Sequence, residues 1–227
     1  MRKYINSDWK KITGRILLLT LVLSIGYAVY KIIVSPVDGN ISQEYEHIKS
    51  DYILMLIQCT LGLVVMFLPN FLEKKWSVFV PNYMSIMYFI FLFCAIFLGE
   101  VRNFYYTVPH WDTILHAFSG AMLGALGFSL VSILNEFKSK SVSLSPFFVS
   151  VFAFSFALSI GAVWEIYEYI CDSILDLNMQ KYLLADGTKL VGRAALKDTM
   201  KDIIVDALSA FVVSVIGYIS LKKRSVD

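Results

Sequence analysis

Charged residues are scarce in this sequence. They make up 17% of its 227 residues, while 57% are hydrophobic, and soluble domains usually carry roughly 25% charged residues. A bilayer accommodates that much apolar surface, whereas a soluble fold does not. The formal net charge of only +2 gives no strong field for nucleic acid, and no stretch interleaves basic and aromatic residues as single-strand binders do. The sequence predicts a membrane protein that does not bind nucleic acid.

Cysteine is rare as well. Cys59, Cys94 and Cys171 are odd in number, and no pair has C-x-x-C spacing. Cys59 and Cys94 fall inside apolar runs, where a free thiol behaves as a small hydrophobic group. The sequence therefore predicts neither a disulfide framework nor a zinc-finger site.

Long apolar runs are what the sequence has in abundance. Six of them approach the roughly 20 residues that a helix needs to cross a bilayer. Each predicts a helix, because backbone polar groups in hydrocarbon must pair within their own segment. The runs lie near residues 16–34, 53–72, 78–98, 112–134, 147–170 and 202–221. With no linker between them, they predict one all-α polytopic membrane domain over residues 1–227. The sequence does not determine its oligomeric state.

The placement of lysine and arginine predicts the orientation. If six helices alternate, the N-terminal segment, Lys74–Lys75, the connection 135–146 and the C-terminus share one side and hold most of the basic residues. Basic residues favour the cytoplasmic side, so both termini are expected there, in the cytoplasmic (inner) membrane of a bacterium. The longest connection, 171–199, is then extracytoplasmic. It contains a predicted hairpin about Asp186-Gly187, which either carries function or only joins two helices.

Ionisable residues gather in the last three predicted helices. Each costs roughly 2.5–3.5 kcal/mol at the centre of a membrane segment on insertion scales, so their positions are informative. Spacings of three or four place those of each helix on one face, and alternating helices bring the three faces to the same extracytoplasmic side. Asp198 is expected in the preceding loop. The predicted set comprises Asp112, His116, Glu165, Glu168, Asp172, Asp202 and Asp206.

So many carboxylates close together in low dielectric need protonation, a basic partner such as Arg102, Arg193 or Lys201, or a cation. Carboxylates with one histidine suit Mg²⁺, Mn²⁺, Ca²⁺, Fe or Zn²⁺. The predicted metal ligands are Asp112, His116, Glu165, Glu168, Asp202 and Asp206. His116 could instead be a catalytic general acid or base held by Asp112. Taken singly, each has a structural alternative: Asp112 as an N-cap, His116 as a hydrogen-bonded core histidine, and the other acids as solvated helix ends.

A set of motifs resembles a known family. The motifs are Asp112-x3-His116-x2-Ser119-Gly120, Trp164-Glu165-x2-Glu168, Asn178-Met179-Gln180 and Asp198-Thr199-Met200-x-Asp202. In this order they resemble the YjdF-type bacterial inner-membrane family, which implies the architecture and these motif residues but no reaction. A more distant likeness is to VanZ-like membrane proteins, from which this chain differs in lacking a Glu-x2-Gln and an Arg…Asp arrangement.

The leading functional hypothesis is a metal-dependent enzyme that acts on a lipid head group or a lipid-linked phosphate. Its partners would be membrane lipids. A proton- or cation-coupled transporter or flippase is the second hypothesis, although no inverted repeat is visible. The third is a membrane scaffold or regulatory subunit whose acidic residues bind a partner.

Overall fold

The structure, a computed structural model, describes residues 2–35, 49–76, 80–137, 144–184 and 188–224. Within these ranges all regular structure is helical, apart from one isolated β-bridge. The six stretches that are long and apolar enough to cross a membrane are Asp8–Val34, Lys49–Lys75, Asn82–Val101, Trp111–Val131, Pro146–Leu175 and Arg193–Lys223. The prediction of an all-α chain with six membrane helices is confirmed.

The chain divides into two compact units, and the boundary after Asp112 falls within the first turn of the helix that begins at Trp111. The first unit contains α1 (Arg2–Val34), α2 (Lys49–Val65), α3 (Leu68–Trp76), α4 (Asn82–Leu92), the π-helix η1 (Phe93–Val101) and α5 (Phe104–Thr107). Within it α1 packs against α2 and α4. Leu17, Leu21, Met55, Cys59 and Phe89 are among the buried residues of its core.

The second predicted helix, 53–72, is interrupted between α2 and α3. Pro69 explains the break, because proline has no N–H to donate to the carbonyl of Val65 and its ring clashes with that carbonyl in a continuous helix. The hydroxyl of Tyr88, on α4, donates to the Val65 carbonyl oxygen at 2.9 Å instead. The break therefore leaves this carbonyl satisfied inside the first unit.

The third span also departs from a regular α-helix. The start predicted at residue 78 lies outside the described residues, and helix is observed from Asn82, widening into η1 at Phe93. The indole Nε1 of Trp111 donates to the carbonyl of Cys94 in this π-helix at 3.3 Å. A left-handed Asn103, with φ of 61°, then turns the chain into α5. Apolar periodicity predicts neither the π-helix nor the short α5.

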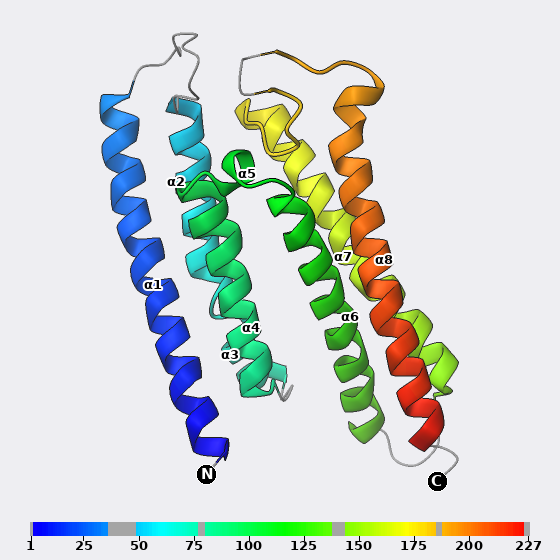
Figure 1. The fold of residues 1–227 in the computed structure, drawn as a ribbon. Coiled ribbons are helices and arrows are strands. Elements are labelled where there is room, and N and C mark those ends of the chain that lie inside the picture. Colours follow the sequence, from blue (N-terminus) through cyan, green and yellow to red (C-terminus); the bar gives the residue numbers. More distant parts are fainter. Residues whose placement is uncertain (1, 36–48, 77–79, 138–143, 185–187, 225–227) are drawn as a thin grey trace. The chain divides into compact units, whose positions relative to one another are not determined.

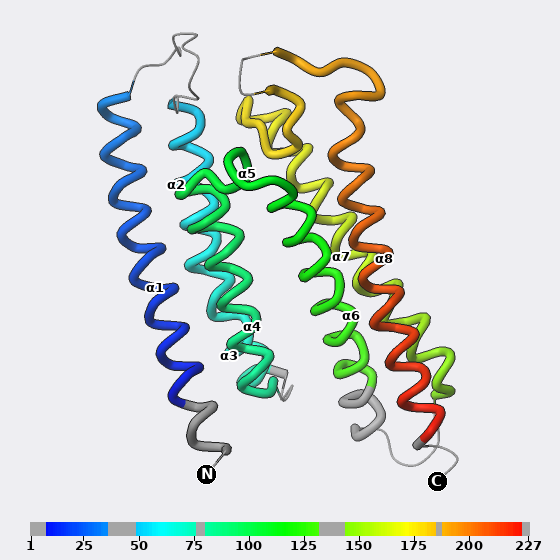
Figure 2. The backbone as a smooth tube through the Cα atoms, in the orientation of Figure 1, coloured from blue at the N-terminus to red at the C-terminus, as the bar shows by residue number. Residues whose placement is uncertain are grey.

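The second unit is built from α6 (Trp111–Phe137), α7 (Pro146–Leu175) and α8 (Arg193–Arg224), which lie side by side in Figure 1. The start of α7 has a strong local signal: Ser145 accepts a hydrogen bond from the Phe148 N–H at 3.2 Å, and Pro146 fits the first helical position. Figure 2 follows the backbone from α7 to α8.

Two predicted boundaries in this unit are wrong. The helix α7 continues to Leu175 and α8 begins at Arg193, so the connection is shorter than the predicted 171–199. Asp198, expected in the loop, lies on α8. Hydropathy marks only the apolar part of a helix, and the polar stretch before Ile203 continues the same helix outside that part.

Glycines let the three helices of the second unit approach closely. A Cβ at Gly120 on α6 would lie 2.9 Å from the carbonyl oxygen of Asp206 on α8. A Cβ at Gly127 would lie 2.7 Å from the Cα of Ala153 on α7. Small residues at such crossings are the usual way for membrane helices to gain packing contacts. This packing fixes the backbones that carry the polar residues described next.

Candidate metal centre

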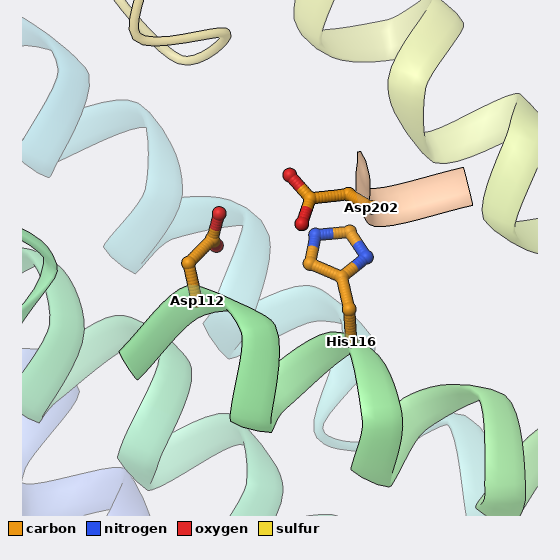
Figure 3. A group of neighbouring side chains, drawn as sticks. All are labelled: Asp112, His116 and Asp202. Atoms are coloured by element: carbon orange, nitrogen blue, oxygen red, sulfur yellow. The ribbon is translucent and has the colours of Figure 1, made fainter. Parts of the chain in front are cut away.

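Three of the predicted residues, Asp112, His116 and Asp202, form a compact group. Each offers a ligand atom, and these atoms lie within 4.8 Å of one another. Figure 3 shows Asp112 and His116 projecting from successive turns of α6 toward Asp202 of α8. Asp112 is the second residue of α6, inside the helix, so it is not the N-cap that the sequence offers as an alternative. His116 is 8% exposed and Asp202 only 2%.

The two nitrogens of the His116 ring face different partners. Nδ1 lies 3.2 Å from Oδ2 of Asp206. Nε2 lies 3.8 Å from Oε1 of Glu165 on α7. A carboxylate at one imidazole nitrogen fixes the ring orientation and favours the tautomer whose other nitrogen carries the lone pair. The arrangement leaves Nε2 as the atom suited to binding a cation.

Asp206 is held by close packing on two sides. Asp206 is 2% exposed. Its Oδ1 accepts from the hydroxyl of Ser119 on α6 at 3.5 Å, and its Oδ2 lies where a Cβ at Gly161 of α7 would collide with it. The sequence predicts the acidic residue, but the role of Gly161 in making room for it depends on the helix packing.

Glu168 and Asp172, the other acids predicted on α7, do not belong to the compact group. Oε1 of Glu168 accepts a hydrogen bond from Nε1 of Trp164 on the same helix at 3.0 Å, and that contact is exposed. Asp172 is buried, and its two oxygens accept from the backbone N–H groups of Met179 and Gln180 at 2.7 and 2.9 Å. Asp172 therefore anchors the connection between α7 and α8.

The connection after α7 is fastened by further side chains. The carboxamide of Asn178 accepts from the Leu183 N–H at 2.9 Å and donates to the Leu183 carbonyl at 2.8 Å. Nε2 of Gln180 donates to Oγ1 of Thr199 on α8 at 2.8 Å. Asn178 and Gln180 fall in a motif that the sequence singled out, but only the structure gives them this fastening role.

The predicted hairpin is reduced to one bridge in the described part of the chain. Leu183 and Lys189 form an isolated antiparallel bridge, and the Leu190 N–H donates to the Tyr182 carbonyl at 2.8 Å. The Asp186-Gly187 turn lies outside the described residues. Burial raises the pKa of Tyr182, and the nearby carboxylates of Asp176 and Asp172 raise it further.

Among the predicted counter-charges, Lys201 lies beside the compact group. Its Nζ is 3.9 Å from Oδ1 of Asp202. Arg193 is exposed at the start of α8. One ammonium beside several acids leaves the group with an excess of carboxylates, which is the composition of a divalent-cation site.

A family model described as "Predicted membrane protein (DUF2238)" matches residues 16–223, a range that contains every residue of the compact group. The chain belongs to the DUF2238 family. A Thermotoga maritima protein described as an uncharacterized protein is 28% identical over 155 residues, or 67% of this chain and 70% of that protein. No solved structure matches the chain. Together with its six spans, membership makes this DUF2238 protein a multi-pass membrane protein.

Proposed function

We propose that this protein is a divalent-cation-dependent membrane enzyme that acts on the phosphate of a lipid head group or lipid-linked substrate. One observation carries the proposal: Asp112, His116 and Asp202 bring three ligand atoms from two helices within 4.8 Å of one another. An acidic group this well buried in a membrane protein is expensive unless a cation or protons neutralise it. A cation also explains why a histidine is oriented among the acids.

The distance between His116 and Glu165 suits two ligands of one ion. Two ligands that each lie about 2.0–2.3 Å from one ion are about 3–4 Å apart, and Nε2 of His116 is 3.8 Å from Oε1 of Glu165. Glu165 is therefore our fourth ligand. Asp206, a predicted ligand, contacts Nδ1 instead, and we assign it the role of orienting His116. Glu168 is left out of the ligand set.

The chemistry we assign to the centre is hydrolysis of a phosphoester. The oxygen of a water molecule forms a bond to phosphorus, the bond from phosphorus to the leaving oxygen breaks, and a proton from the water ends on that leaving oxygen. A cation at the group would polarise the phosphoryl oxygen and make the water more acidic. We assign Glu165, whose Oε1 lies 3.8 Å from Nε2 of His116, to holding the cation and not to accepting the proton.

The position of the group supports action at a membrane surface. Asp112 is the second residue of α6 and His116 lies one turn further on. This places the group near the end of a span, close to the level of lipid head groups. By the distribution of basic residues we assign that end to the extracytoplasmic side of the bacterial cytoplasmic membrane, with both termini in the cytoplasm. The YjdF-type resemblance agrees with this architecture and adds no reaction.

The unbroken helices favour an enzyme over a transporter. Ion-coupled transporters usually bind their ions near the bilayer midplane, at interrupted helices. The helices that carry the group, α6, α7 and α8, run without interruption through Asp112, Glu165 and Asp202. A scaffold that uses its acidic residues to bind a partner would not need a buried histidine that is oriented by a buried Asp206.

The test is elemental analysis of the purified protein in buffers free of chelator and supplied with Mg²⁺, Mn²⁺, Zn²⁺, Fe²⁺ and Ca²⁺. We expect one ion per chain, and its loss in His116→Ala and Asp202→Asn. Asp206→Asn should keep the ion with about 10–100-fold weaker affinity, because an orienting residue is replaced rather than a ligand. Glu73→Gln, which removes a carboxylate on α3 paired with Lys10, is the control and should keep the ion fully.

Turnover is then measured on the same samples. Release of phosphate or of a phosphorylated head group from lipid should require the ion and stop in Asp202→Asn. Absence of any bound ion in the wild-type protein would overturn the proposal. A cation flux across vesicles that depends on Asp202, without lipid turnover, would replace it with the transporter hypothesis.

A further inference from the structure

The polar start of α8 carries three basic side chains in one row. Arg193, Lys197 and Lys201 are spaced by four residues, so they follow one another along a ridge of the helix. Arg193 and Lys197 are exposed and Lys201 is half-buried. We call these three residues the basic row. It ends at the compact group, where Nζ of Lys201 lies 3.9 Å from Oδ1 of Asp202.

Stability of the helix does not explain the basic row. The amino end of a helix has a partial positive charge, so cations there are unfavourable. The first turn of α8 contains Arg193 and no acidic residue. Asp202 lies beside Lys201 at the end of the row, and Asp198, the other acidic residue on this part of α8, is paired with Lys181 of the connection at 3.9 Å. The row therefore concentrates positive charge, which suits an anionic ligand.

An apolar row runs beside the basic row on the same helix. Leu196, Met200, Ile204 and Leu208 are also spaced by four, and each is between 43% and 61% exposed. Leu196 follows Arg193 by three positions and Met200 follows Lys197 by three, so the two rows are neighbours on the helix surface. The apolar row continues into the membrane span, whereas the basic row stops at Lys201. This combination matches an amphiphile whose charged group is at the membrane surface.

We propose that the basic row binds the phosphate of an anionic lipid whose acyl chain lies along the apolar row. The inference deepens the proposed function and rests on it, since the row selects the substrate that the compact group acts on. Arg193 and Lys197 attract the head group at the membrane surface. Lys201 then holds its phosphate beside the compact group, where Asp202 lies. A zwitterionic lipid has the same phosphate but carries its own cation, so the row favours a lipid with net negative charge.

The experiment measures lipid binding to the full chain purified in a neutral detergent. The probes are a short-chain phosphatidylglycerol, a phosphatidylcholine with the same acyl chains, and inorganic phosphate. The test variant is Arg193→Gln/Lys197→Gln, which leaves the compact group and Lys201 in place. The matched control is Lys222→Gln/Lys223→Gln, which removes two positive charges from the opposite end of α8.

We expect the test variant to bind phosphatidylglycerol about 30-fold more weakly, with the control unchanged, since each of the two basic residues removed contributes about 1 kcal/mol of attraction to an anionic lipid. Equal binding of phosphatidylcholine by the wild type, or an equal loss in both variants, would overturn the inference. Inorganic phosphate bound as tightly as phosphatidylglycerol would also overturn it, because the site would then be one for free phosphate. Weaker binding at higher salt is expected throughout.

Metal content is measured on the same samples to separate this inference from the proposed function. Selective lipid binding by a protein that never holds an ion would leave the basic row standing and remove the proposed enzyme. An ion held by a protein without lipid selectivity would do the reverse.

Discussion

Oδ2 of Asp206 occupies the space directly over Gly161, so that a Cβ at this position of α7 would collide with the carboxylate. The same oxygen contacts Nδ1 of His116 at 3.2 Å. A residue on one helix thus controls, through an acid on a second, the ring orientation of a histidine on a third. The geometry of the candidate centre therefore depends on how closely the three helices pack.

Replacing Gly161 with alanine is expected to displace the Asp206 carboxylate and weaken ion binding by about 10–100-fold, the range seen when a partner of a ligating histidine is lost. Elemental analysis or an ion titration measures this. Gly26→Ala on α1 is the control, because a Cβ there meets no atom within 4 Å. Unchanged ion affinity in Gly161→Ala would show that Asp206 does not orient His116. Circular dichroism of both variants checks that the helices are retained.

Ion binding should stabilise the protein, because an ion that binds only the folded state shifts the unfolding equilibrium. At an ion concentration of 100 times the dissociation constant the gain is about 2.7 kcal/mol. We expect a higher midpoint of thermal unfolding on adding the ion and a return to the lower midpoint with a chelator. Asp202→Asn should show neither change. A shift of equal size in that variant would place the ion elsewhere.

The two glutamates of α7 should behave differently. Glu165 is 4% exposed and faces Nε2 of His116, whereas Glu168 accepts an exposed hydrogen bond from Trp164. Glu165→Gln is expected to lower ion affinity by at least tenfold, and Glu168→Gln to leave it within about twofold, since a lost ligand costs as much as a lost ligand partner or more. An ion titration of both variants decides. Loss of the ion in Glu168→Gln would restore Glu168 to the ligand set that the sequence predicts.

Removal of the Asp172 carboxylate should free the connection between α7 and α8. Asp172→Ala leaves the N–H groups of Met179 and Gln180 without their acceptors, which costs about 1–3 kcal/mol for a buried group. We expect faster amide hydrogen exchange at residues 179 and 180 and faster proteolysis nearby. Asp172→Asn keeps one acceptor oxygen and should have an intermediate effect. Ser173→Ala removes a hydroxyl that donates to the Tyr169 carbonyl on the same helix, and it should have no effect on the connection.

The proposed orientation can be tested with thiol labelling. Val191 is 80% exposed, and Cys59 and Cys171 are buried. In a background with the three native cysteines replaced by serine, Val191→Cys should react with a membrane-impermeant reagent in intact cells. Lys223→Cys should react only after the membrane is opened. The opposite pattern would reverse the assigned sides and place the candidate centre at the cytoplasmic face.

The six helices could be predicted because apolar length is a property of the sequence alone. The irregular parts of these helices are not predicted where they depend on contacts with other helices. Pro69 could have suggested the interruption after Val65, but the carbonyl that it leaves is satisfied by Tyr88, some 23 residues away. No residue in the sequence of this helix predicts the change from α-helix to the π-helix η1 at Phe93. The polar start of α8 is not predicted, because the apolar run that marks this helix begins only near residue 202.

The candidate centre was predicted in its residue types and only partly in its geometry. Spacing placed Asp112 with His116 on one face of α6, and the structure agrees. Spacing could not separate Asp202 from Asp206, which also share a face, because their different partners are set by the closeness of Gly161 and Gly120. The spacing also groups Asp172 with these acids. In the structure it binds the backbone of Met179 and Gln180 after the end of α7, a contact that helical periodicity does not predict.

The order of the helices has a consequence for biosynthesis. Asp112 and His116 belong to α6, Glu165 to α7, and Asp202 and Asp206 to α8, which follows both in the chain. A nascent chain therefore carries the histidine into the membrane before the two aspartates that complete its surroundings have been synthesised. On our proposal the ion cannot be held until α8 has packed against α6 and α7, so the insertion of this one helix decides whether the centre forms.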